Sequence, residues 1–148
     1  MIEFIAGTFL VGTMIFSIIQ FGFLCAGQGA VETAAHFAAR KFAINARTDF
    51  RKAKAAALAE ASSLCRKRPG GGWEGTTLTS IRFSLDGKEE TAPQARSGEA
   101  YKVQLTHGVE LVVPWVNRML FLLAPVPKIR VADKYYLLLH ATRWVTVE

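Results

Sequence analysis

The sequence predicts an α+β protein in which one long amino-terminal helix packs on a small antiparallel sheet domain that also holds one short helix. Residues 4–68 contain no proline and show first an apolar run and then a helical period. Residues 77–147 instead contain stretches in which apolar and polar residues alternate, as they do in strands. We therefore expect a membrane-spanning helix over 1–31, its amphipathic continuation over 32–68 and the sheet domain over 69–148.

The run from Phe4 to Val31 contains no Asp, Glu, Lys or Arg in 28 residues. About 20 predominantly apolar residues cross a hydrocarbon core about 30 Å thick, so this run can span a bilayer once. No basic segment precedes it and no small-residue cleavage motif ends it, which argues against a cleaved secretory signal. The run contains five glycines, Gly7, Gly12, Gly22, Gly27 and Gly29. Small residues let neighbouring helices approach closely, so helix packing is favoured over a plain lipid anchor, which stays open.

The segment from Glu32 to Arg68 carries nine lysines and arginines against three acids and accounts for the net charge of +6. It lacks proline and glycine and is rich in helix-favouring residues. Its apolar residues recur at helical spacing and form one stripe: Ala35, Ala39, Phe42, Ala46, Phe50, Ala53, Ala57, Ala61 and Leu64. Four basic residues form a second stripe: Arg40, Arg47, Arg51 and Lys54. The two stripes predict one flank that is buried and one that is charged.

Only Gly27 and Gly29 interrupt the sequence between the apolar run and this segment. We therefore expect a single helix from about residue 2 to 65, ~95 Å long, with a bend or local melting near the two glycines. On such a helix Cys25 and Cys65 would lie ~60 Å apart. That excludes a disulfide within one chain, because the Cα atoms must approach to about 7 Å, and leaves bridges between subunits open.

Candidate catalytic and metal-binding residues are not found in the sequence. Two cysteines are too few for a zinc site. His36, His107 and His140 are far apart and lack an accompanying acidic or cysteine cluster, so we expect each to be a surface or packed residue. There is no phosphate-binding glycine loop. The sequence predicts no enzyme activity, no cofactor and no metal.

The carboxyl half is predicted to begin at a helix stop, Pro69–Gly72. Strands are expected over Thr77–Leu85, Tyr101–Val113 and Tyr135–Val147, with a tight turn at Asp86–Gly87, a loop over Lys88–Ala100, a bend or bulge at Gly108 and a short helix over Trp115–Leu123 after Pro114. Alone, about 75 residues bury little core. We therefore expect the alanine-rich stripe to cover one face of the sheet.

Several short features occur in a specific order along the chain. At the amino terminus these are Ile2-Glu3-Phe4 before the apolar run, the pair Phe21-Gly22 and the alanine-rich continuation Val31–Arg47. At the carboxyl end a strand runs into Val113-Pro114-Trp115-Val116 and a last strand ends in Trp144–Glu148. Each motif is weak, but the order of the parts is specific and resembles that of TadE-like pilins, a branch of the type IV pilin superfamily.

The resemblance implies a structural subunit of a type IV pilus-like extracellular filament, or fimbrium, with roles such as cell adhesion and without cofactors. Such a subunit is a single-pass inner-membrane protein until the pilus assembly machinery draws it into a filament of its own copies or of other pilin subunits. The implied interface residues are Met1, Glu3, Phe4, Phe9, Phe16, Phe21 and Phe23. The Glu3 carboxylate is expected to pair with the Met1 amine of a neighbour, since an unpaired charge in an apolar core costs several kcal/mol.

The sequence leaves two points open: the side of the membrane on which the carboxyl domain lies, and the function. The family's precursors carry a basic leader cut after glycine that leaves the glutamate fifth, whereas the glutamate here is third and no leader precedes it. Basic residues begin at Arg40, so the visible charges would place the carboxyl domain in the cytoplasm, while the resemblance places it outside. The alternative function is a membrane-tethered extracytoplasmic binding module on a helical stalk. Nucleic acid is not an expected partner, because no aromatic residues interleave with the basic stripe.

Overall fold

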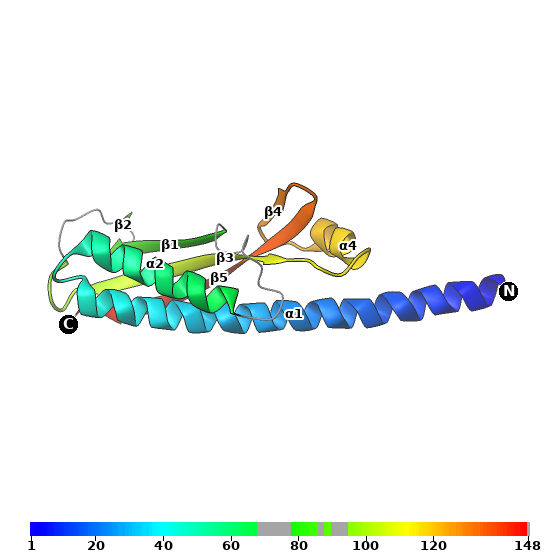
Figure 1. Ribbon diagram of the computed structural model, residues 1–148, viewed down its shortest axis with the longest axis horizontal. Coiled ribbons are helices and arrows are strands. Elements are labelled where there is room, and N and C mark those ends of the chain that lie inside the picture. The colour runs from blue at the N-terminus through cyan, green and yellow to red at the C-terminus, as the bar shows by residue number, and fades with distance from the viewer. Residues whose placement is uncertain (68–77, 86–87, 90–94, 148) are drawn as a thin grey trace.

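The computed structural model describes residues 1–67, 78–85, 88–89 and 95–147 and has the predicted α+β architecture. Its helices are α1 (Ile2–Asn45), α2 (Phe50–Arg66) and α4 (Val116–Leu123), and its strands are β1 (Thr79–Leu85), β2 (Lys88–Glu89), β3 (Ala100–Glu110), β4 (Lys128–Val131) and β5 (Lys134–Thr146). The five strands form a curled antiparallel sheet in the order β2-β1-β3-β5-β4. Helices α1 and α2 cover one face of this sheet, and the amino-terminal part of α1 projects beyond the rest of the chain (Figure 1).

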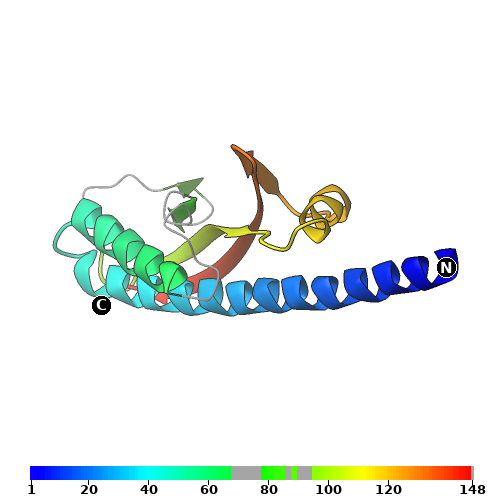
Figure 2. The ribbon, with the colours of Figure 1, turned by 45° about the vertical axis from the view of Figure 1, so that its right-hand side comes forward.

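The predicted single helix through residue 65 is wrong. Helix α1 ends at Asn45, a turn follows, and α2 runs back alongside the carboxyl half of α1 (Figure 2). The rings of Phe42 and Phe50 meet edge to face with their centroids 5.3 Å apart. On an unbroken helix the two residues would be separated by ~12 Å along the axis. The folded-back arrangement is more stable than a continuous helix because it buries the alanines of both helices against each other and against the sheet. On a continuous helix the alanines of the second half would remain in water.

Asp49 starts the second helix. Its backbone is extended, and its Oδ1 accepts hydrogen bonds from the backbone N–H groups of Arg51 at 3.0 Å and Lys52 at 3.1 Å. These bonds satisfy two of the N–H groups that a helix start leaves without an intrahelical partner. The hydrogen bond from the Lys52 backbone is the main reason why the pKa of the Asp49 carboxyl is lowered from its ordinary value of 3.8. An Asp before a helical stretch is a recognised start signal, but the apolar period continues across this position, so the sequence alone did not establish a break.

Replacing Asp49 by alanine is expected to lower the melting temperature of the detergent-solubilised protein by a few degrees, while Asn, which also caps helices, should retain most of the stability. Because the folded-state pKa is lowered, the charged carboxylate stabilises the fold above pH 3.8 and loses this effect as the pH falls through the folded-state pKa. Thermal unfolding followed by circular dichroism between pH 7 and pH 3 measures both effects. A difference between wild type and Asp49→Ala that does not narrow at low pH would contradict this account.

The core lies between the two helices and the sheet. The whole predicted apolar stripe is buried except Leu64, which is half-buried, so the prediction that alanines cover the sheet is confirmed. At its centre, Phe42 stacks on Phe83 of β1 with the ring centroids 4.2 Å apart and contacts the ring of Tyr101 of β3 at 5.4 Å. The small alanine side chains bring the helix backbones close, and the aromatic rings fill the space at the end where α1 and α2 meet.

Gly108 does not form the predicted bend or bulge. Strand β3 stays in continuous register with β5 on both sides of it. The glycine is needed for a close approach, because a Cβ at this position would lie 2.8 Å from the Leu78 Cδ1 atom. Its N–H donates to the Leu78 carbonyl oxygen at 3.2 Å. A side chain at residue 108 would therefore push away the segment that enters β1.

Three further predictions have different outcomes. Helix α1 runs through Gly27 and Gly29 without interruption, so no local melting occurs there. Cys25 is exposed on α1 and Cys65 is buried in α2, and neither cysteine is in a disulfide; the ~60 Å estimate no longer applies because α2 folds back. The predicted helix stop at residues 69–72 and the tight turn at residues 86–87 lie outside the described residues.

Candidate functional site

The projecting half of α1 is the candidate functional surface, which we call the apolar rod and define as residues 2–19. By length and composition α1 could span a membrane, and only 6% of its most apolar 18-residue stretch is buried. Phe4, Phe9 and Phe16 are 79%, 62% and 49% exposed. Monomeric soluble proteins rarely leave so much contiguous apolar surface in water. The rod therefore requires a cover of lipid or of other helices.

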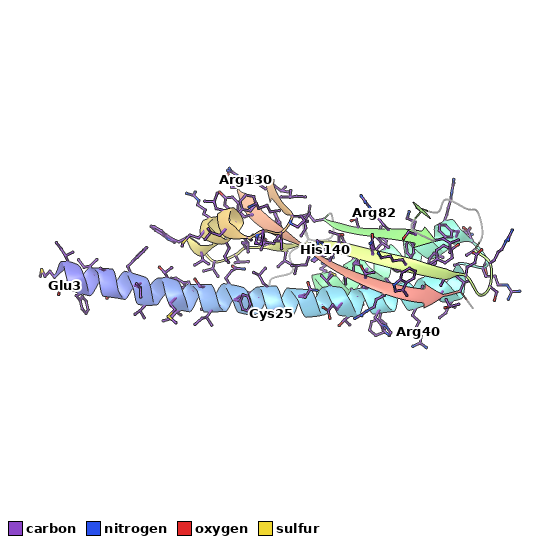
Figure 3. The ribbon with its side chains drawn as sticks, turned by 180° about the vertical axis from the view of Figure 1, so that it is seen from behind. Glu3, Cys25, Arg40, Arg82, Arg130 and His140 are labelled. Carbon is purple, nitrogen blue, oxygen red and sulfur yellow. The ribbon has the colours of Figure 1, made fainter. Side chains whose placement is uncertain are left out.

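The predicted interface residues extend along this helix. Met1, Glu3, Phe4, Phe9, Phe16 and Phe21 are exposed and Phe23 is half-buried. Glu3 lies at the free end of the rod, far from the globular part (Figure 3). Its side chain borders a shallow groove of about 600 Å³ along one face of the helix, which Gly7 and Gly12 also line. The structure thus presents these residues on one accessible element without bringing them into contact with one another.

The hydroxyl side chains of the rod are satisfied within the helix. The hydroxyls of Thr8, Thr13 and Ser17 donate to the backbone oxygens four residues earlier, at 2.8 to 2.9 Å. In an apolar medium every polar group must find an internal partner, because water is not present. The hydroxyl groups of the rod therefore need no water as a hydrogen-bond partner.

Gln20 makes a contact between α1 and the sheet domain that was not predicted from the sequence. Its side chain is fully buried, and its Oε1 accepts a hydrogen bond from the backbone N–H of Val113 at 2.9 Å. Its Nε2 is buried and has no hydrogen-bond partner. The bond fixes the segment before α4 to α1. A lone amide between Phe4 and Gly27, in a run otherwise without amide or charged side chains, was the signal that could have revealed it.

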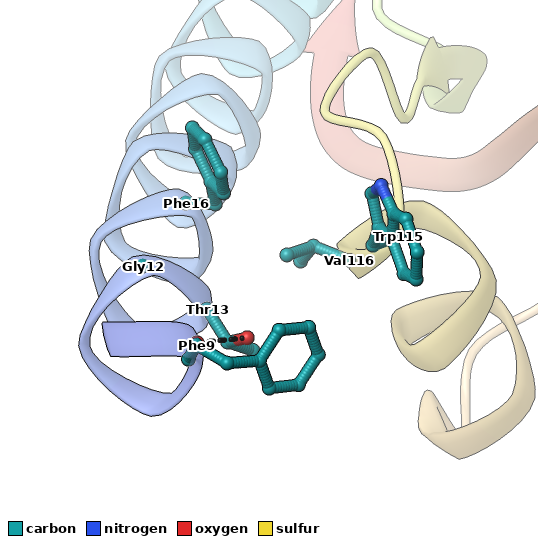
Figure 4. A pocket seen from close by; sticks show the side chains of 6 residues that line it. All are labelled: Phe9, Gly12, Thr13, Phe16, Trp115 and Val116. Atoms are coloured by element: carbon teal, nitrogen blue, oxygen red, sulfur yellow. Dashed lines mark hydrogen bonds between the residues drawn. The ribbon is translucent and has the colours of Figure 1, made fainter. Parts of the chain in front are cut away.

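The start of α4 reaches down the rod from Gln20. The rings of Phe9 and Trp115 are packed edge to face with their centroids 6.3 Å apart. Together with Phe16 and Val116 they border an apolar groove of about 350 Å³ between α1 and α4 (Figure 4). Trp115 adopts a backbone φ of 69°, which is rare for a bulky residue and costs free energy that the surrounding contacts must offset. The short helix predicted over Trp115–Leu123 is confirmed as α4. Its packing against the apolar half of α1 was not predicted.

No protein-family model, no curated protein and no solved structure matches this chain. The resemblance to TadE-like pilins therefore stays a prediction. The fold and the exposed apolar helix are the observations from which a function can be argued.

The predicted basic stripe does not form a single helix face. Arg40 is on α1, Arg47 is in the turn, and Arg51 and Lys54 are on α2. All are exposed except Lys54, which is half-buried. Because the stripe was drawn on a continuous helix, the reversal at residues 46–49 divides it. These cations are solvent-facing side chains spread around the end where the two helices meet.

The histidines lie where packed or surface residues were expected. His36 and His140 are exposed, and His107 of β3 is buried with its Nδ1 2.8 Å from the hydroxyl of Thr79 on β1. Within residues 1–67, 78–85, 88–89 and 95–147, no group of three or more histidine, cysteine or acidic side chains is arranged to hold a metal ion. The apolar rod and its contact with α4 are the features that demand a functional explanation.

Proposed function

We propose that this protein is a structural subunit of a type IV pilus-like, TadE-like extracellular filament that assembles through the apolar rod. The supporting observation is that one uninterrupted helix is exposed and apolar in its first half and forms the domain core in its second half. Such a helix can exchange lipid for the helices of neighbouring subunits without refolding. Before assembly the subunit is held in the inner membrane by α1 with its sheet domain outside the cytoplasm, and the pilus assembly machinery then draws it into the filament.

The glycines of α1 support helix packing over a plain anchor. A Cβ built at Gly7, Gly12, Gly22 or Gly29 would meet nothing within 4 Å. Contacts within one chain therefore do not require glycine at these positions. In a bundle of α1 helices the same glycines would let the backbones of neighbours approach closely, which strengthens their van der Waals contacts.

Negative-stain microscopy of sheared surface material from the source cells tests the proposal, with mass spectrometry of any filaments to measure the abundance of this protein. We expect the protein in thin filaments as well as in the membrane fraction. Recovery from the membrane fraction alone, under conditions in which filaments of other subunits are collected, would overturn the filament role. It would favour the tethered binding module instead.

Replacing Gly7 by leucine is expected to preserve folding and membrane insertion and to reduce incorporation into filaments about fivefold or more. The position is open in the subunit, but extra volume in a packed helix interface costs about 1–3 kcal/mol. The ratio of sheared to membrane-bound protein measures the effect. Ile5→Leu, at a position that is 67% exposed on the same helix, is the volume-matched control. A stalk would tolerate both changes equally.

A further inference from the structure

The length of α1 that is free of the domain is too short to cross a membrane alone. Counted from the amino terminus, the rest of the chain contacts α1 first at Phe9, through the Trp115 ring, and then at Gln20, through the Val113 N–H. The residues before Phe9 span only ~12 Å at 1.5 Å per residue, whereas a hydrocarbon core is about 30 Å thick. Residues 2–20 together span ~28 Å, which matches one core. When α1 crosses the bilayer in this conformation, the Trp115 ring, which meets the Phe9 ring, therefore lies below the level of Gln20 and inside the hydrocarbon.

The backbone of the α4 segment is prepared for such a position. The Val113 N–H donates to Gln20 inside the contact with α1. At the other end of α4, the Lys128 Nζ donates to the carbonyl oxygens of Phe121 at 2.6 Å, Leu122 at 3.3 Å and Ala124 at 3.4 Å. These carbonyls belong to the last turn, where a helix leaves its acceptors unsatisfied. The Val113 N–H and these carbonyl oxygens, which would otherwise need water, are thus paired with side chains of the same chain.

The outward surface of α4 continues the surface of the rod. Of the residues in α4, only Val116 is buried. The exposed apolar side chains on and next to this helix are Trp115, Met119, Leu122, Leu123 and Val126. The exposed basic residues beside them are Arg118, Lys128 and Arg130. An apolar helix with an exposed tryptophan and basic residues beside it has the composition of helices that insert into a bilayer surface.

We propose that α4 is a second membrane-embedded element, which inserts into the bilayer leaflet beside α1 and makes lipid contacts through Trp115, Leu122 and Leu123. The subunit is then held by a helical span and by the tip of its folded domain. When the subunit leaves the membrane, both α1 and α4 must leave the lipid. The inference rests on membrane anchoring and is independent of whether the protein forms filaments.

Quenching of tryptophan fluorescence by brominated acyl chains tests the proposal on the full-length protein, reconstituted at no more than one copy per vesicle so that no second copy can cover α4. One variant keeps only Trp115 and a second keeps only Trp144, which is 65% exposed on β5; in both, the remaining tryptophans, including Trp73, are replaced by phenylalanine. We expect brominated lipids to quench Trp115 several-fold more strongly than Trp144, and aqueous acrylamide to show the reverse order. Equal acrylamide quenching of both residues, or no lipid quenching of Trp115, would overturn the proposal.

A charge variant separates lipid insertion from a loss of fold. Leu122 and Leu123 are 78% and 75% exposed, so replacing both by glutamate should leave the circular dichroism spectrum in detergent unchanged. In vesicles the same variant should lose most of the lipid quenching of Trp115, because carboxylates oppose insertion. Thr142→Glu, on the exposed surface of β5, is the control and should keep the quenching. Full quenching in the double variant would show that α4 does not enter the lipid through these leucines.

Discussion

Replacing Glu3 by glutamine is expected to leave membrane insertion intact and to lower the share of the protein in sheared filaments more than about tenfold, because breaking a buried ion pair costs about 3–5 kcal/mol. Glu3 is exposed at the end of the apolar rod. If assembly moves the rod into a bundle of helices, this carboxylate enters an apolar setting and requires an ammonium group of a neighbouring subunit. The amide keeps the shape and leaves that ammonium buried without its counter-charge.

The measurement is the ratio of sheared extracellular to membrane-bound protein at equal expression. Asp133→Asn serves as the matched control, since it also removes one negative charge, at a carboxylate that is fully exposed in the turn between β4 and β5. The control should behave as wild type. Equal ratios for wild type and Glu3→Gln would remove the role of the Glu3 charge in assembly and would favour the stalk alternative.

Replacing Phe42 by alanine is expected to destabilise the folded domain by about 3–5 kcal/mol, the usual cost of removing a buried phenylalanine ring. In a chain of this length that corresponds to a melting temperature lower by about 6–20 °C. The ring is fully buried and contacts Phe50 of α2, Phe83 of β1 and Tyr101 of β3. The Phe50 ring contacts Phe42, Phe83 and Tyr101 at centroid distances of 5.3 to 6.4 Å, whereas Phe42 stacks on Phe83 at 4.2 Å, so Phe42 is the more closely packed of the two rings.

Thermal unfolding of the detergent-solubilised full-length protein measures this loss. Phe37→Ala is the control on the same helix, at a ring that is 46% exposed and contacts only the His36 ring among the described aromatic side chains. It should change the melting temperature by no more than a few degrees. The Phe42 ring meets Phe50 only because α2 folds back. Equal changes in melting temperature for Phe42→Ala and Phe37→Ala would therefore contradict this arrangement.

Local patterns in the sequence predicted the apolar helix, the buried helix faces and the three long strands of this fold. The apolar run predicted a membrane-crossing length of helix because it contains no charge from Phe4 to Val31. The spacing of the alanines predicted which side of the helices is buried, and eight of the nine predicted positions are buried. Alternation predicted the three long strands, because side chains in a strand point to opposite faces of the sheet. These are properties of neighbouring residues, so a sequence is sufficient to read them.

Only the tertiary structure decided how far the long helix continues and what packs against its apolar half. The period of the alanine stripe continues across residues 46–49, so periodicity alone could not reveal the reversal. It follows from the free energy gained when two alanine faces and one sheet exclude water together. The contact of Gln20 with Val113, 93 residues later, depends on the curl of the sheet that places α4 beside α1. No local pattern predicts this contact, because the relative position of the two residues depends on all the turns and strand twists between them.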